Sequence, residues 1–294
     1  FTGSTNFDLI ANELGKENTG AVFAMVFILV GLAFKVSAVP FHMWTPDVYE
    51  GAPTSITSFF ALVPKIAALS VFIRFMYVPF INIIEQWQMI IVLLSIASMI
   101  LGAVAAIGQN NIKRLMAYSS IGHMGYALAG ISTGTNTGIQ SSIMYLIIYL
   151  LMNLGVFGCI FMMKRENFYH ENISDLSGLS KNNPLLALSF LIILFSLAGI
   201  PPLAGFFAKF YVFMAVIESE MYLLAIIGLL TTVVSAFYYL RIIKIIYFDK
   251  PKTKFDENYD WGLKISVAVS SILVLIYFVY PSILLNLISS IQIY

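Results

Sequence analysis

Three lysines, Lys35, Lys65 and Lys209, fall inside long apolar stretches of this 294-residue chain, and His123 lies near the middle of another. A lysine at the centre of a membrane is costly unless its ammonium meets water, a carboxylate or a carbonyl oxygen. Burial disfavours the charged form and a nearby carboxylate favours it, so a moving counter-charge can load or release a proton near neutral pH. These residue types at these positions predict proton transfer inside a membrane.

Each of these residues also has a structural interpretation. Lys65 lies 11 and 15 residues from the ends of the apolar stretch 54–80, beyond the reach of a side chain that snorkels to the interface, so a functional role is favoured there. Lys35 and Lys209 each lie within seven positions of a proline, where freed backbone carbonyls could bind an ammonium. His123 lies among serines and glycines that either hold water for a proton relay or simply allow close helix packing.

The composition is that of a membrane protein. Apolar residues make up 60% of the chain, charged residues 11%, and the mean hydropathy is +0.89. A net charge of +1 indicates no nucleic-acid partner, and the single cysteine, Cys159, excludes an internal disulfide and a cysteine-ligated iron–sulfur cluster. No phosphate loop or metal-ligand spacing is present, and the aromatic residues are scattered as membrane anchors would be.

Eight apolar stretches predict an all-α, polytopic membrane protein. The predicted spans are 20–49, 54–80, 88–108, 112–131, 139–163, 184–217, 221–247 and 263–290. The first contains Pro40 and Pro46, and the sixth contains Pro201 and Pro202 between two glycines, so we expect both helices to be interrupted near the membrane centre. Two broken helices at separated positions are typical of the inverted repeats of secondary transporters.

The basic residues outside the spans predict the orientation. Eleven of the sixteen fall on one side of the predicted topology and identify it as the cytoplasmic or matrix side, with both ends of the chain opposite. These eleven are Lys113, Arg114, Lys164, Arg165, Lys181, Arg241, Lys244, Lys250, Lys252, Lys254 and Lys264. All fifteen acidic residues fall in connectors or close to span ends, so the membrane centre is expected to hold lysines without carboxylates.

Three motifs carry a family resemblance. They are FKVSAVPFHMWTPDVYEGAP at 34–53, NIKRLMAYSSIGH at 111–123 and GIPPLAGFFAKFY at 199–211. In order and approximate spacing they resemble the antiporter-like membrane subunit N (mitochondrial subunit 2) of respiratory complex I, the NADH:quinone oxidoreductase.

The resemblance implies a fourteen-helix fold of two inverted five-helix repeats, of which this chain matches helices seven to fourteen. Residues 1–80 would then be the end of the first repeat, with two transmembrane helices. Residues 81–250 would be the second repeat, with five, and 251–294 the C-terminal transmembrane helix. Six helices are missing, and a fragment, an incomplete sequence or a split gene would each account for them, in agreement with the first residue, Phe1, not being a methionine.

The same resemblance implies residue roles. Lys35 would be the first half-channel lysine, Lys65 the connecting lysine, His123 a central relay and Lys209 the second half-channel lysine. The family pairs the first lysine with a glutamate on an early helix, and this sequence has no such residue. We therefore expect a carboxylate from another chain, or from the missing first six helices, near Lys35.

The implied function is that of a non-redox subunit that moves protons, coupled to quinone reduction elsewhere. Flavin, iron–sulfur clusters and quinone would belong to partner subunits, with no cofactor in this chain. The partners would be other complex I membrane subunits, a companion chain or missing segment, and membrane lipid, without nucleic acid. The membrane would be the mitochondrial inner membrane or the bacterial plasma membrane. Two alternatives stay open: a subunit of a multisubunit cation/proton antiporter, and a scaffold whose lysines are idle.

Overall fold

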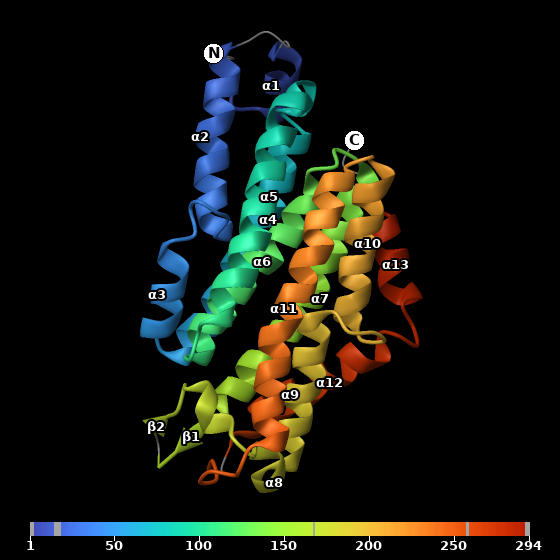
Figure 1. Cartoon of the computed structure of the whole chain (residues 1–294). Helices are drawn as coiled ribbons and strands as arrows, with labels where there is room; N and C mark the ends of the chain where they lie inside the picture. Colours follow the sequence, from blue (N-terminus) through green and yellow to red (C-terminus); the bar gives the residue numbers. More distant parts are fainter. Residues whose placement is uncertain (1–2, 15–18, 167, 257–258, 292–294) are drawn as a thin grey trace.

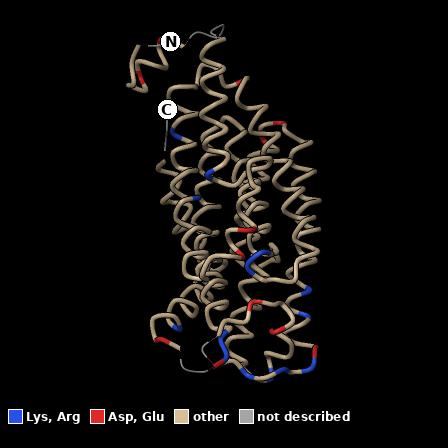
Figure 2. Tube along the Cα trace, turned by 90° about the vertical axis from the view of Figure 1, so that its left-hand side faces the viewer, with Lys and Arg blue, Asp and Glu red and all other residues tan. Residues whose placement is uncertain are grey.

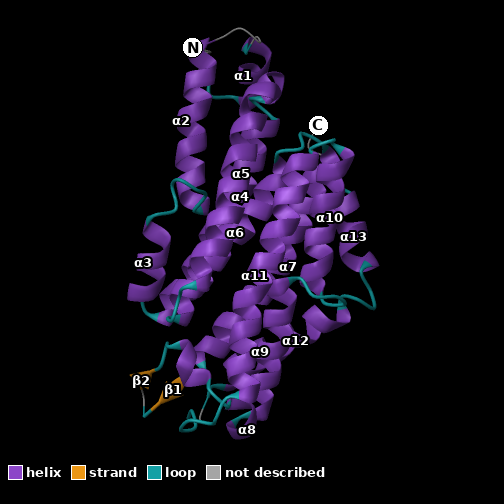
Figure 3. Ribbon diagram, viewed as in Figure 1, coloured by secondary structure: helices purple, strands orange, loops and turns teal. Residues whose placement is uncertain are grey.

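The computed structural model describes residues 3–14, 19–166, 168–256 and 259–291, and these residues are mostly helical (Figures 1 and 3). A short antiparallel hairpin joins β1 (Lys164–Arg165) to β2 (Phe168–Tyr169) at one end of the molecule. Helices suit an apolar chain because they satisfy every backbone hydrogen bond within one segment, as the lipid interior demands. The predicted all-α membrane class is confirmed.

Within the described residues, five helices are long and apolar enough to cross a membrane. They are α2 (Thr19–Val36), α4 (Thr54–Tyr77), α5 (Ile84–Ile107, preceded by a short turn, Ile81–Ile83), α7 (Asn136–Phe161) and α11 (Tyr222–Phe248). Helix α6 (Ile112–Ile131) has the bounds of the predicted span 112–131 and is more polar. A short helix, α1 (Phe7–Glu13), precedes α2 and lay outside the predicted spans.

The two expected helix interruptions are present. Helix α2 ends at Val36 and α3 (Trp44–Gly51) begins after the segment that holds Pro40. Helix α9 (Pro184–Ala198) ends at Gly199, whose φ of 86° is the left-handed conformation common at helix C-termini, and α10 (Ala204–Glu218) follows.

The predicted continuous span 263–290 is wrong. The structure has two helices there, α12 (Trp261–Ile276) and α13 (Ser282–Ser289). Pro281 accounts for the interruption, because proline lacks the N–H that an α-helix needs and disfavours the helical conformation of the residue before it. The number of membrane crossings therefore stays a prediction.

Helix α6 occupies the centre of the fold and is buried along nearly its whole length. It packs closely against α5 and also contacts α3, α4, α7 and α10 (Figure 1). The Cα of Gly102 on α5 faces the backbone of Gly122 on α6, and the absence of two side chains allows the helices to approach closely. Side chains of α6 can therefore contact residues that precede it in the sequence, on α3 to α5, and residues that follow it, on α7 and α10.

Many of the charged residues gather at one end of the molecule, called the charged end below (Figure 2). The buried Lys113 ammonium lies 2.7 Å from the Glu171 carboxylate and donates to the Ala52 carbonyl at 2.8 Å. This end also holds the 162–183 connector, with α8 (Leu179–Asn182) and a turn at Ile173–Leu176, and the 249–260 connector. These connectors carry many of the basic residues that predict the cytoplasmic or matrix side. That this end faces the cytoplasm or matrix stays a prediction.

Candidate functional site

One side of α6 carries a row of polar side chains. Ser119, Ser120, His123 and Tyr126 are all buried, and residues three or four apart share a helix face. Asn111 begins this helix, and its side-chain oxygen accepts from the backbone N–H groups of the second and third residues that follow. The row runs along the centre of the molecule and is positioned by packing on several sides.

The Lys65 side chain reaches this row from α4 and is fully buried. Its ammonium donates to the Ser120 hydroxyl at 2.5 Å, and the Tyr149 hydroxyl of α7 donates to the same oxygen at 2.8 Å. The Lys65 Nζ also lies 5.4 Å from the centre of the Tyr49 ring, in the range of a cation–π contact. Neutral groups therefore surround this ammonium.

Two tyrosines hold the His123 imidazole. Its Nδ1 lies 2.5 Å from the Tyr145 hydroxyl of α7, and its Nε2 lies 3.1 Å from the Tyr239 hydroxyl of α11. Tyr239 also shares a 2.5 Å hydrogen bond with Ser119. A neutral imidazole has one donor and one acceptor nitrogen, and a hydroxyl can complete either, so both tautomers can be satisfied here.

Lys209 approaches from α10 on the other side of the row and is buried. Its ammonium donates to the carbonyls of Leu197 and Ala198, at 3.1 and 3.0 Å, and lies 5.1 Å from the centre of the Tyr126 ring. The end of α9 at Gly199 leaves these carbonyls without helical partners, so the interruption supplies the lysine with acceptors. The Tyr126 hydroxyl bonds in turn to two threonines of α11.

Lys65, His123 and Lys209 are thus brought together along α6, in three neighbouring groups. The rings of His123 and Tyr149 have centroids 5.2 Å apart, and those of His123 and Tyr126 are 6.1 Å apart. In the part of the chain described, no direct hydrogen bond links one group to the next. Small motions or water would complete the connection between them.

The structure does not place Lys35 in this cluster. It lies at the end of α2, one residue before the interruption, and its side chain is exposed. Within residues 3–14, 19–166, 168–256 and 259–291, its ammonium makes no hydrogen bond or ion pair. The neighbouring Phe34 is also exposed, so this face of α2 is uncovered in the structure.

In the described part of the chain, no carboxylate pairs with Lys65 or Lys209. The described ion pairs of Asp47, Glu50, Glu171, Asp175 and Asp249 all lie at the charged end of the molecule. Lys65 and Lys209 each have hydrogen-bond acceptors and an aromatic ring instead. Such surroundings stabilise an ammonium less than a carboxylate would, so either protonation state is accessible at modest cost.

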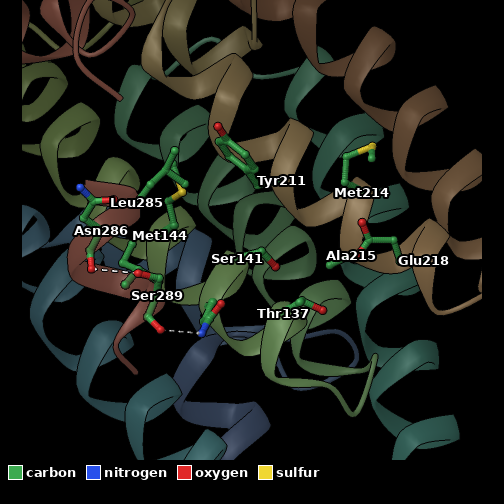
Figure 4. A pocket seen from close by; sticks show the side chains of 12 residues that line it. Thr137, Ser141, Met144, Tyr211, Met214, Ala215, Glu218, Leu285, Asn286 and Ser289 are labelled. Carbon is green, nitrogen blue, oxygen red and sulfur yellow. Dashed lines mark hydrogen bonds between the residues drawn. The ribbon is translucent and has the colours of Figure 1, made fainter. Parts of the chain in front are cut away.

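A cavity of about 340 Å³ lies between α7, α10 and α13, away from the charged end. Thr137, Ser141, Tyr211 and Glu218 line it together with apolar side chains (Figure 4). Tyr211 lies two residues beyond Lys209 on α10, although Lys209 does not line the cavity.

The sequence reasoning missed the tyrosines of this site. It interpreted the aromatic residues as scattered membrane anchors, which is wrong for Tyr49, Tyr145, Tyr149 and Tyr239, all of them fully buried. A signal was available, because Tyr145 and Tyr149 lie four residues apart inside an apolar span. A phenol there must find a polar partner.

Comparison with known proteins gives a consistent family. A family model described as NADH:quinone oxidoreductase/Mrp antiporter, TM, matches residues 1–235. The NADH-quinone oxidoreductase subunit N of Pelagibacter ubique is 66% identical over 293 residues, which is 100% of this chain and 62% of that protein. The protein of the same name from Parvibaculum lavamentivorans is 55% identical over 284 residues, 96% of this chain and 59% of that protein. The chain thus spans about three fifths of the curated relatives' length.

Two solved structures are similar in fold. A chain of respiratory complex I from Thermus thermophilus with bound aureothin superimposes with a TM-score of 0.78 and 32% identity, over 92% of this chain and 60% of that chain. A chain of the Mrp complex from a Dietzia species gives a TM-score of 0.87 over 98% of this chain and 61% of that chain. Its identity of 22% shows the fold alone.

Proposed function

The chain belongs to the NADH:quinone oxidoreductase/Mrp antiporter transmembrane family, and on this premise we propose that it conducts protons within subunit N of a respiratory NADH:quinone oxidoreductase. Lys65, His123 and Lys209 would exchange the proton, and hydroxyls on α6, α7 and α11 would orient it. The chain itself would do no redox chemistry. Partner subunits would hold flavin, iron–sulfur clusters and quinone.

A single observation carries this proposal: two buried lysines lie on either side of a buried histidine, and among the described residues none of the three is paired with a carboxylate. Idle lysines would cost stability at these positions without benefit. The neutral acceptors around them keep the cost of losing the proton low. The arrangement therefore favours a relay over a scaffold.

The first test replaces Lys65 with alanine in the complete NADH:quinone oxidoreductase, reconstituted into vesicles. We expect Lys65→Ala to lower the number of protons pumped per NADH oxidised while the complex still assembles, because removal of a costly buried charge need not destabilise α4. Lys244→Ala is the control, since that lysine is exposed and pairs with Asp249 at the charged end. Unchanged pumping by Lys65→Ala in an assembled complex would contradict the relay.

A second variant separates charge from proton exchange. Lys65→Arg keeps a positive charge, but a guanidinium does not lose its proton in proteins. We expect it to restore less than full pumping. Full recovery would mean that only the charge is needed at this position.

The proposal extends to Lys35. Its exposed ammonium at the uncovered face of α2 would meet a carboxylate from a helix outside these 294 residues, in the same protein or in a neighbouring subunit. A structure of the assembled complex should place an aspartate or glutamate within 4 Å of Lys35, the usual salt-bridge distance. Only apolar side chains around Lys35 would refute this pairing.

The competing function is that of a subunit in a multisubunit cation/proton antiporter, whose fold is shared. The relatives at 66% and 55% identity favour the oxidoreductase, because both bear that name. Co-purification distinguishes the two, since the oxidoreductase brings flavin and iron–sulfur proteins with it. A complex without them would favour the antiporter.

A further inference from the structure

A groove of about 780 Å³ runs between α9 and α12, on a different side of α7 from the buried lysines. Its walls are formed mainly by apolar side chains, several of them exposed, including Leu185, Leu188, Ile272 and Leu275. In a membrane such a groove opens towards lipid. It lies outside the site described above.

The depth of the groove matches one leaflet of a bilayer. On α9 it extends from Asn183 to Ile192, about 14 Å at the helical rise, and on α12 from Lys264 to Leu275, about 16 Å. Half of the hydrocarbon core measures about 15 Å. Helix α9 stops at Ala198, six residues beyond Ile192, and α12 stops at Ile276, one residue beyond Leu275. An acyl chain fits this depth, whereas a spanning helix of another protein would need a groove across the whole membrane.

The end of the groove at the charged side carries a cation. Among the described residues, Lys264 is the one charged residue that lines the groove, and none of these lining residues is acidic. The Lys264 ammonium lies 5.7 Å from the Trp261 ring and 6.0 Å from the Tyr259 ring, aromatic residues of the kind enriched at membrane interfaces. The nearest acidic residue along the helix, Asp260, is exposed, and within the described residues Lys264 pairs with no carboxylate.

Polar residues also lie at this end of the groove. The side chains of Asn182 and Asn183 line the same end, and the Asn182 amide donates to the Lys252 carbonyl at 2.6 Å, which fixes its orientation. The connector that leads to α12 holds three further lysines and four acidic residues, so its charges nearly balance. The groove thus combines an apolar body with one lysine, Lys264, at its mouth.

We propose that this groove binds an anionic phospholipid of the adjacent leaflet. The phosphate of the headgroup meets the Lys264 ammonium and the Asn183 amide, and one acyl chain lies between α9 and α12 down to Ile192 and Leu275. A zwitterionic phospholipid of the same chain length fills the apolar part equally well, but its headgroup has no net charge to offset Lys264.

Photoactivatable lipids test this directly in the assembled complex. The complex is reconstituted in bilayers that contain a phosphatidylglycerol with a diazirine on its acyl chain or, separately, the phosphatidylcholine with the same chain. Labelled peptides are then identified by mass spectrometry. We expect the anionic probe to label the α9 and α12 peptides that contain Ile192 and Leu275 more strongly than the zwitterionic probe.

Two variants and a control decide the outcome. Lys264→Ala should lower labelling by the anionic probe about fivefold, the effect of one basic residue at a membrane surface, and leave the zwitterionic probe unchanged. Ala268→Phe, which fills the groove, should abolish labelling by both probes. Lys244→Ala, at the same end but paired with Asp249, should change neither.

Three results would overturn the proposal: equal labelling by both probes, no effect of Lys264→Ala, or a neighbouring subunit cross-linked into the groove in place of lipid. None of these readouts depends on proton pumping. The lipid site can therefore be confirmed or refuted independently of the proposed relay.

Discussion

The contact between α5 and α6 yields a prediction in which two similar substitutions have opposite outcomes. A Cβ added to Gly102 would lie 2.5 Å from the backbone nitrogen of Gly122, 2.7 Å from its Cα and 2.8 Å from the carbonyl oxygen of Tyr118. A Cβ added to Gly122 would come no nearer than 3.8 Å to Gly102. The contact between α5 and α6 therefore has no space for a methyl group at Gly102 but enough space for one at Gly122.

The size of the effect follows from these distances. All three atoms near the added Gly102 Cβ belong to the backbone, so no side chain can rotate away, and the helices must separate by about 1 Å to restore normal contact. Overpacking of this kind costs about 1–3 kcal/mol. Gly122→Ala instead gains up to about 1 kcal/mol, because alanine favours the helix more than glycine does.

The displacement would also reach the proposed relay. Ser120 and His123 lie on α6 within one turn of Gly122, so a shift of the helix changes their distances to Lys65 and the tyrosines. A misplacement of about 1 Å can lower a rate about a hundredfold. We expect Gly102→Ala to lower both the thermal stability of the subunit and proton pumping, and Gly122→Ala to preserve both.

The measurements are made on the assembled complex in detergent and in vesicles. Loss of intact complex after heating, followed by size-exclusion chromatography, reports stability, and acidification per NADH oxidised reports pumping. Equal losses for the two variants would show that the α5–α6 contact is not as close as described. A greater loss for Gly122→Ala would refute the reasoning outright.

Two further predictions concern charged groups. Glu171→Ala removes the carboxylate partner of the buried Lys113 and should destabilise the subunit by about 1–3 kcal/mol. Asp249→Ala breaks an exposed ion pair and should destabilise it by less than about 1 kcal/mol. Thermal denaturation of the complex compares the two variants. Tyr126→Phe keeps the ring near the Lys209 ammonium and should retain most of the proton pumping. Tyr126→Leu removes the ring and should lower pumping severalfold. Equal pumping by the two variants would argue against the cation–π contact.

Much of the architecture could be predicted from the sequence because lipid imposes simple rules on it. Span length follows from membrane thickness, and the interruptions near Pro40 and at Gly199 follow from residues that cannot continue a helix. The interruption before Ser282 was overlooked because the flanking residues are strongly apolar, although Pro281 itself was a sufficient signal. Hydropathy alone cannot detect a helix end that is apolar on both sides.

The site could be predicted only in part, since single residues reveal their type and depth but not their neighbours. Lys65, His123 and Lys209 are predicted as site residues because ionisable groups are rare within apolar spans. Tyr239, which lies 116 residues from His123 in sequence, became part of the site only through the packing of α11 against the helices around α6. No local pattern predicts such a contact.

The attachment of α3 to α6 has a consequence for ionic strength. Arg114, in the first turn of α6, contacts both Asp47 and Glu50 of α3, and all three side chains are partly exposed. Dissolved salt screens such pairs, with a Debye length of about 8 Å at physiological concentration and about 3 Å at 1 M. The same short helix carries Tyr49, whose ring lies near the Lys65 ammonium. A change in the surrounding electrolyte that loosens α3 would therefore alter the surroundings of Lys65, although this lysine is fully buried.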